Sequence, residues 1–390
     1  MGWRLPLAIA GGVALLRLST MPALPFAADV SWYSWLHAAP LRPLHTFFRT
    51  TENRWRPSRV LPYLPAIRRA QEMLLESGKV AWHQRATVTR ESGRGLTPTI
   101  VLGGFVPDSD AQVFLLRRFF LQAGALYSLQ YSRVGFSLDL ICAQLDDLVA
   151  ELSLSGQRPV VFGVSFGAGI VLEWLRRHKE KGTSVALAGV VLVSPVACVA
   201  DVLSPAVAKP ATLLGRAVQP YLNPLRPPSA AAVERSRLVF KRMFAAGTQN
   251  QAALLRLMTG AELKALRTSV EGAVGGITTT GACERMQAMV AMKAPTDYFG
   301  PELLPLSTAP ALILFAENEE AVLVAEAPSL FAFKQAHKAY FPSGSVREVR
   351  ARAGAQPVQH ASLIFHVFEF LPPLQAFYAR LRAMPLSLAA

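Results

Sequence analysis

From residue 97 onward, short apolar runs alternate with longer amphipathic stretches. The runs are apolar at every position rather than at every second one, which is typical of strands in a parallel sheet buried on both faces. The stretches between them have helical spacing, as in 138–152, where Leu138, Ile141 and Leu145 share one face. The pattern predicts an α/β fold with a mostly parallel central sheet and helices on both faces. The predicted strands are 99–102, 125–131, 159–162, 187–193, 311–315 and 346–349.

Weaker patterns predict further elements around this sheet. Residues 62–79 have an amphipathic helical pattern, and 80–88 resemble one or two edge strands. Asp110 is placed to cap a helix over 111–122. A final helix is expected over 361–377.

A long insertion separates two of the predicted strands. About 120 residues lie between the runs at 187–193 and 311–315, too many for a simple loop. The insertion contains a proline cluster at 220–228 and several helical stretches, and it predicts a helical cap over the C-terminal edge of the sheet. Three of its methionines fit either a buried helix face or an adaptable apolar wall: Met286, Met289 and Met292. The predicted divisions are a leader at 1–60, a core in two parts at 61–200 and 310–390, and the cap at 201–309.

The run at 159–162 ends in a motif that can carry chemistry. Residues 163–167 read Gly-Val-Ser-Phe-Gly, a G-x-S-x-G pattern, and an apolar helical stretch follows. A serine on a tight turn between strand and helix has its hydroxyl lifted clear of the sheet. The flanking glycines suit a turn with no room for side chains. Ser165 is therefore the candidate nucleophile.

In this order of elements the chain resembles the α/β-hydrolase superfamily over about residues 97–377. The resemblance implies a triad in the order serine, acid, histidine. The base would be a late histidine, and His360 lies in a loop position before the last predicted helix. His366 would fall within that helix, and His337 would lie on an earlier one.

The resemblance places the triad acid shortly after the strand at 311–315. Residues 315–322 read Phe-Ala-Glu-Asn-Glu-Glu-Ala-Val, and Glu319 stands where the family usually has aspartate. Glutamate is one methylene longer, so its loop must lie further back. The alternatives are Glu317, Glu320 and Asp201.

The oxyanion hole implied by the resemblance uses two backbone N–H groups. One is that of Phe166, directly after the nucleophile. The other comes from the turn Gly103-Gly104-Phe105, where glycine replaces the family's usual histidine. Phe105 is the first candidate and Gly104 the second. The chain has neither G-x-G-x-x-G nor a Walker pattern, so this turn is not expected to bind phosphate.

Composition narrows the range of partners. Hydrophobic residues make up 52% of the 390 and charged residues 17%, which argues against disorder. The formal net charge of +14 favours anionic surfaces, although the basic residues are scattered and no nucleic-acid motif is present. Cys142, Cys198 and Cys283 fit neither a zinc site nor a disulfide framework. We expect no metal, no cofactor and no nucleic-acid partner.

The leader at 1–60 has three interpretations. Its apolar stretch at 5–16 is too short to span a bilayer comfortably but suits a signal peptide. The aromatic residues and arginines that follow suit a membrane–water boundary, which would make 1–60 a membrane contact. The third interpretation is an arm packed on the core. The localisation is therefore left open.

Together these features predict a serine hydrolase that cleaves a carboxylic ester, with a small-molecule or lipid-like substrate whose acyl group is apolar. Acyl transfer on the same triad is an alternative that the sequence does not separate from hydrolysis. A catalytically silent relative that only binds its ligand is a second alternative, since the chain departs from the family pattern at Glu319 and Gly103.

Overall fold

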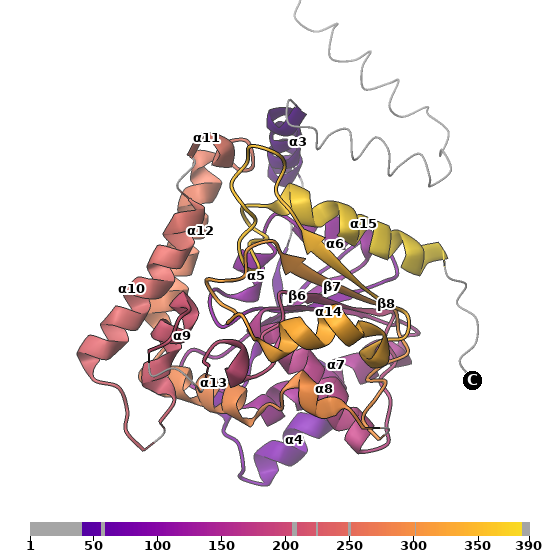
Figure 1. Cartoon of the computed structure of the whole chain (residues 1–390). Helices are drawn as coiled ribbons and strands as arrows, with labels where there is room; N and C mark the ends of the chain where they lie inside the picture. The colour runs from indigo at the N-terminus through magenta and orange to yellow at the C-terminus, as the bar shows by residue number, and fades with distance from the viewer. Residues whose placement is uncertain are drawn as a thin grey trace, which may run out of the picture.

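An eight-stranded sheet forms the centre of the protein (Figure 1). The computed structural model describes residues 41–55, 59–204, 209–223, 225–248, 251–300 and 302–383. The strand order is β1-β2-β4-β3-β5-β6-β7-β8; β2 is antiparallel to β1 and β4, and the other pairs are parallel. This confirms the predicted mostly parallel sheet. The strands are β1 (Leu61–Tyr63), β2 (Thr87–Glu91), β3 (Thr99–Leu102), β4 (Leu126–Gln130), β5 (Val160–Val164), β6 (Gly189–Val193), β7 (Ala311–Ala316) and β8 (Gly344–Val349).

Helices cover both faces of this sheet, as predicted (Figure 1). On one face α7, α8 and α14 pack on the strands, and on the other α6 and α15 do so. Every residue of β3, β5, β6 and β7 is buried, because side chains on alternate sides of each strand enter the two cores. The helices outside the insertion are α3 (Arg42–Trp55), α4 (Arg69–Glu76), α5 (Ser109–Gln112), α6 (Arg117–Ala123), α7 (Leu138–Leu154), α8 (Phe166–Glu180), α14 (Pro328–Tyr340) and α15 (Val367–Ala383), with 3-10 turns η2 (Trp82–Gln84) and η3 (Val199–Asp201).

Two predictions near the start of the core were wrong in extent. The helix expected over 62–79 is reduced to α4, because Pro62 and Pro65 favour extended backbone before it. The stretch 80–88, expected to hold edge strands, contains η2 and only the first residues of β2.

Two helix starts also differ from the prediction. The helix over 111–122 is divided into α5 and α6, and Asp110 lies in the first turn of α5 rather than capping it. The last helix begins at Val367, six residues later than expected, and Ala361, where it was expected to start, has a φ of 49° that an α-helix does not accommodate.

The long insertion between β6 and β7 is mostly helical. Helices α10 and α12 lie side by side next to the sheet (Figure 1). Met286 and Met289 on α13 are fully buried in the core, which confirms the buried-face interpretation for these two residues. We call α9 to α13 the cap helices: α9 (Leu213–Val218), α10 (Ala230–Gly247), α11 (Gln251–Leu254), α12 (Gly260–Gly276) and α13 (Thr279–Ala291), accompanied by 3-10 turns η4 (Gln219–Tyr221) and η5 (Pro295–Tyr298).

Helix α3 belongs to the predicted leader. It is tied to α12 and α15, because Arg49 pairs with Glu262 and Arg42 with Glu369. The three interpretations of the leader rest largely on residues 1–40, which lie outside the described residues. Among the described helices, none combines the length and apolar character needed to cross a membrane.

Candidate active site

Ser165 occupies the sharp turn between β5 and α8. Its backbone is held at φ 52° and ψ −117°, a conformation that L-residues rarely adopt. Glycine at 167 allows the close approach that this turn needs, since a Cβ there would lie 2.4 Å from the carbonyl oxygens of Leu102 and Gly103. The sequence therefore forms the strand–turn–helix that its G-x-S-x-G pattern predicted.

His360 and Glu319 come from two loops to meet Ser165. His360 lies between β8 and α15, and its Nε2 is 2.9 Å from Ser165 Oγ. Its Nδ1 is hydrogen-bonded to Glu319 Oε2, on the loop after β7. All three side chains are largely buried. The structure thus brings the predicted nucleophile, base and acid into one hydrogen-bonded chain.

A fourth residue, Ser194, supports the acid. It follows β6 directly, is completely buried and has a φ of 45°. Its hydroxyl donates to Glu319 Oε1 at 2.8 Å and accepts from the Ala361 N–H at 3.1 Å, which joins the acid to the histidine loop. The Ala316 N–H also donates to Glu319 Oε1, at 2.7 Å. The sequence analysis missed Ser194, although a polar residue directly after a buried strand was an available signal.

The alternative acids have other surroundings. Glu317 accepts two backbone N–H groups from the loop after β8, which lowers its pKa. Asp201 is fully buried, which raises its pKa, and it accepts hydrogen bonds from Ser329. Glu320 is exposed. In the described structure none of these carboxylates is hydrogen-bonded to His360.

The other late histidines also differ from His360. His366 lines the same cavity as Ser165, but its Nδ1 is hydrogen-bonded to Ser362 Oγ at 3.0 Å, and burial lowers its pKa. His337 lies on α14 and does not line this cavity. His360 is therefore the late histidine in hydrogen-bond contact with the candidate nucleophile.

The two predicted oxyanion donors lie close to Ser165. Phe166 follows it directly, and a Cβ on Gly104, the neighbour of Phe105, would lie 3.4 Å from Ser165 Cβ. Within the described residues, the N–H groups of Phe105 and Phe166 make no hydrogen bond, so both are available to an oxyanion. Gly104, the second candidate, has its N–H committed to Gln112 Oε1 at 2.7 Å. Gln112 was not predicted from the sequence, since no motif surrounds it.

A cap residue holds the oxyanion turn. Arg285 on α13 donates to the Phe105 carbonyl at 2.6 Å and to the Ser132 carbonyl at 3.0 Å. Burial lowers the pKa of Arg285 to about 10. These contacts restrain the turn that carries the predicted donor. Nothing in the sequence pointed to Arg285, because it lies 180 residues from the group that it holds.

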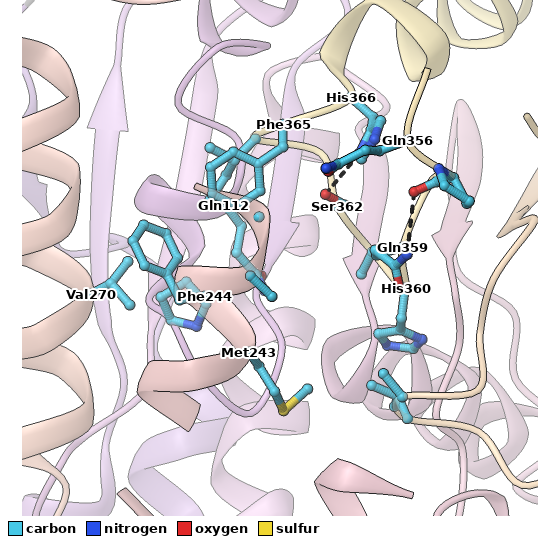
Figure 2. Close-up of a pocket in the computed structure, with 18 of the residues that line it drawn as sticks. Gln112, Met243, Phe244, Val270, Gln356, Gln359, His360, Ser362, Phe365 and His366 are labelled. Atoms are coloured by element: carbon cyan, nitrogen blue, oxygen red, sulfur yellow. Dashed lines mark hydrogen bonds between the residues drawn. The ribbon is translucent and has the colours of Figure 1, made fainter. Parts of the chain in front are cut away.

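A cavity of about 740 Å³ opens in front of Ser165 and His360. The cap helices supply an apolar wall, where Met243, Phe244 and Val270 lie across from the His360 loop (Figure 2). The side nearer α15 carries polar residues, Ser362 and His366, beside Phe365 (Figure 2). The described residues contain no cluster of three side chains that could hold a metal ion.

No family model matches the chain, and no curated relative matches its sequence. Solved structures are similar at low identity. The structure of a bacterial membrane phospholipase A aligns with a TM-score of 0.54 and 16% identity, over 96% of this chain and 98% of that one. A putative aryl esterase from Burkholderia cenocepacia aligns with a TM-score of 0.50 and 11% identity, over 77% and 96% of the two chains. With the sheet order and the turn at Ser165, these neighbours establish that the chain has the α/β-hydrolase fold.

Proposed function

We propose that the chain is a serine hydrolase that cleaves carboxylic esters with an apolar acyl group. The observation that carries this proposal is the hydrogen-bonded chain from Ser165 through His360 to Glu319, beside a cavity. A serine hydroxyl is a weak nucleophile until a base removes its proton. Here the base is within hydrogen-bond distance and an acid orients it, which is the arrangement that acyl transfer to serine requires.

The geometry supports the following steps. His360 Nε2 takes the Ser165 proton while Oγ attacks the ester carbonyl carbon. The carbonyl oxygen becomes an oxyanion, which the N–H groups of Phe105 and Phe166 stabilise. Protonated His360, held by Glu319, gives the proton to the departing alcohol and leaves the acyl group on Ser165. Water, deprotonated by His360, then releases the carboxylic acid.

The cavity supports an apolar acyl group. Burying the methylene groups of an acyl chain against apolar side chains of the cap helices is favourable, and these side chains offer few hydrogen-bond partners to a polar substrate. The two structural neighbours are named as a phospholipase and a putative aryl esterase, and both names denote ester hydrolysis. The apolar wall consists of Phe240, Met243, Phe244, Leu254 and Val270.

Labelling with a fluorophosphonate probe tests the nucleophile. We expect the wild type to become labelled, and both Ser165→Ala and His360→Ala to abolish the labelling, because the first removes the reacting oxygen and the second its base. Ser362→Ala is the matched control, since Ser362 lines the same cavity outside the triad. This variant should be labelled like the wild type.

Product analysis completes the test. Esters of increasing acyl length should release free acid, and an added alcohol acceptor shows whether acyl transfer competes with hydrolysis. A folded wild type that neither reacts with the probe nor cleaves any ester would contradict the proposal and favour a protein that only binds its ligand.

A further inference from the structure

Helix α3 has an inverted distribution of polar and apolar residues. Its buried positions are Thr46 and Arg49: Thr46 Oγ1 donates to the Arg256 carbonyl at 2.6 Å, and Arg49 makes a bidentate pair with Glu262 at 2.6 and 2.8 Å. A helix that packs on a protein core normally buries its apolar side. In α3 that side is exposed, and nothing in the described structure covers it.

The large apolar side chains on the exposed side are mostly aromatic. Leu44, Phe47 and Phe48 are 44%, 61% and 55% exposed, at spacings that place them on one side of the helix. Trp55, 82% exposed, ends the helix, and Leu255 on the adjacent turn before α12 is 54% exposed. Single exposed apolar residues need no explanation, but a group of this size marks an interaction surface. We call these five residues the α3 face.

Positive charge surrounds the α3 face. Arg54, Arg256 and Arg352 are exposed, and among the described residues no ion pair neutralises them. Glu52, the acidic residue of α3, is already paired with Arg118. Aromatic side chains beside arginines are the combination found where a protein meets the headgroup layer of an anionic membrane.

The α3 face also adjoins the cavity. Arg42, the first residue of α3, lines the cavity together with its partner Glu369. Burial lowers the pKa of Arg42, its partner Glu369 opposes this shift, and the charges of Arg352 and Arg256 add to the lowering.

We propose that the α3 face docks on an anionic phospholipid surface, with its aromatic side chains entering the boundary between headgroups and acyl chains. This goes beyond the proposed function, since ester hydrolysis by itself requires no such surface. Docking in this way would hold the cavity rim formed by Arg42 against the lipid.

Charge argues against the other occupants of this face. In a symmetric dimer the same arginine-bordered surface would meet its own copy, and the like charges would repel. Residues 1–40 of the leader offer a single carboxylate, Asp29, against Arg4 and Arg17, so this segment does not complement the arginines. A membrane that contains acidic lipid supplies both an apolar layer and negative charge.

A fluorescent label on the α3 face tests the proposal in the full chain. An NBD group is attached to Phe48→Cys in a Cys283→Ser background, because Cys142 and Cys198 are buried while Cys283 is partly exposed. We expect the NBD emission to shift to the blue and to be quenched by brominated lipid when vesicles of phosphatidylcholine with phosphatidylglycerol are added. Phosphatidylcholine alone should have a weaker effect. The matched control carries the label at Phe331→Cys on α14, 63% exposed, and should not respond.

Vesicle sedimentation gives the energetic test. Phe47→Ser/Phe48→Ser/Trp55→Ser should lower the partition of the chain onto these vesicles about tenfold. Trp82→Ser/Leu154→Ser/Phe331→Ser, which removes equally exposed apolar side chains elsewhere, should leave it unchanged.

Two results would overturn the proposal. One is an NBD label at position 48 whose emission changes with vesicles no more than that of the label on α14. The emission at position 48 reports on α3 itself, so this result counts even if another part of the leader binds lipid. The other is emission that is already shifted to the blue without vesicles, because another segment of this chain or a second copy then covers the face. Fluorophosphonate labelling of the same variants, which does not depend on lipid, keeps this outcome separate from failure of the proposed ester hydrolysis.

Discussion

At the residue scale, Ser194 links the acid of the candidate site to the loop that carries the base. Ser194→Ala removes the donor to Glu319 Oε1 and the acceptor for the Ala361 N–H. A buried polar group left without its partner costs about 1–3 kcal/mol, so we expect kcat for an ester to fall about tenfold with KM nearly unchanged. Steady-state kinetics on a soluble ester measure both constants.

A glycine variant separates the hydroxyl from the backbone strain. Ser194→Gly also lacks the hydroxyl but suits the φ of 45°, so it should lose as much kcat as Ser194→Ala while unfolding at a higher temperature. Full kcat in either variant would show that the hydroxyl does not position Glu319.

Glu319 itself is the acid that we expect catalysis to require. Glu319→Gln keeps the shape of the side chain but replaces the carboxylate that faces His360 Nδ1, and kcat should fall roughly 10³- to 10⁴-fold through loss of the correct tautomer. Glu317→Gln is the matched control, because a glutamine oxygen can still accept the two backbone N–H groups, and its kcat should stay near that of the wild type. The opposite ranking of the two variants would move the acid to Glu317.

At the element scale, the sequence predicted the strands that are buried on both faces, because an uninterrupted apolar run leaves few other structures. The positions of Ser165, Glu319 and His360 were predictable for a related reason, since each residue follows the end of a strand or lies in a loop at the same edge of the sheet. Arg285 was not, because its contact with Phe105 joins the cap to a turn 180 residues away. The start of the last helix was predicted wrongly, because the positive φ of Ala361 has no signal in the sequence.

Helix α3 should carry a pH dependence through His45. Burial, together with the charges of Arg49 and Arg118, lowers the pKa of His45 to about 4, while the unfolded chain has an ordinary histidine. The unfolded state therefore binds the proton more readily, so stability is full above about pH 6.5 and is lost as the pH falls towards 4. Because the ring is only half-buried, we expect a loss of about 1–2 kcal/mol at pH 4 relative to pH 7.

Urea unfolding at the two pH values measures this effect. His45→Gln has no proton to bind at this position, so it should lose less stability on acidification than the wild type. Equal losses in the two proteins would assign the acid sensitivity to other groups.

At the scale of the whole molecule, the candidate site is shared between two parts of the chain. The sheet and its loops supply Ser165, His360 and Glu319, whereas the cap helices supply the wall that an acyl group would contact. Because the nucleophile and the wall belong to different elements, the chain length that is accepted can change while the reactivity of Ser165 stays the same.

Substitutions in the wall should therefore alter selectivity among esters. Val270→Phe on α12 adds volume to the cavity wall, and kcat/KM for long-chain esters should fall about tenfold relative to short-chain ones as buried methylene groups lose their space. Phe244→Ala should shift the preference in the opposite direction. Val290→Phe, the same substitution at an exposed position of α13, should change neither. If Val270→Phe instead lowers kcat/KM equally for all chain lengths and slows fluorophosphonate labelling, the wall shapes the reacting centre, and the acyl group must bind on the polar side near α15.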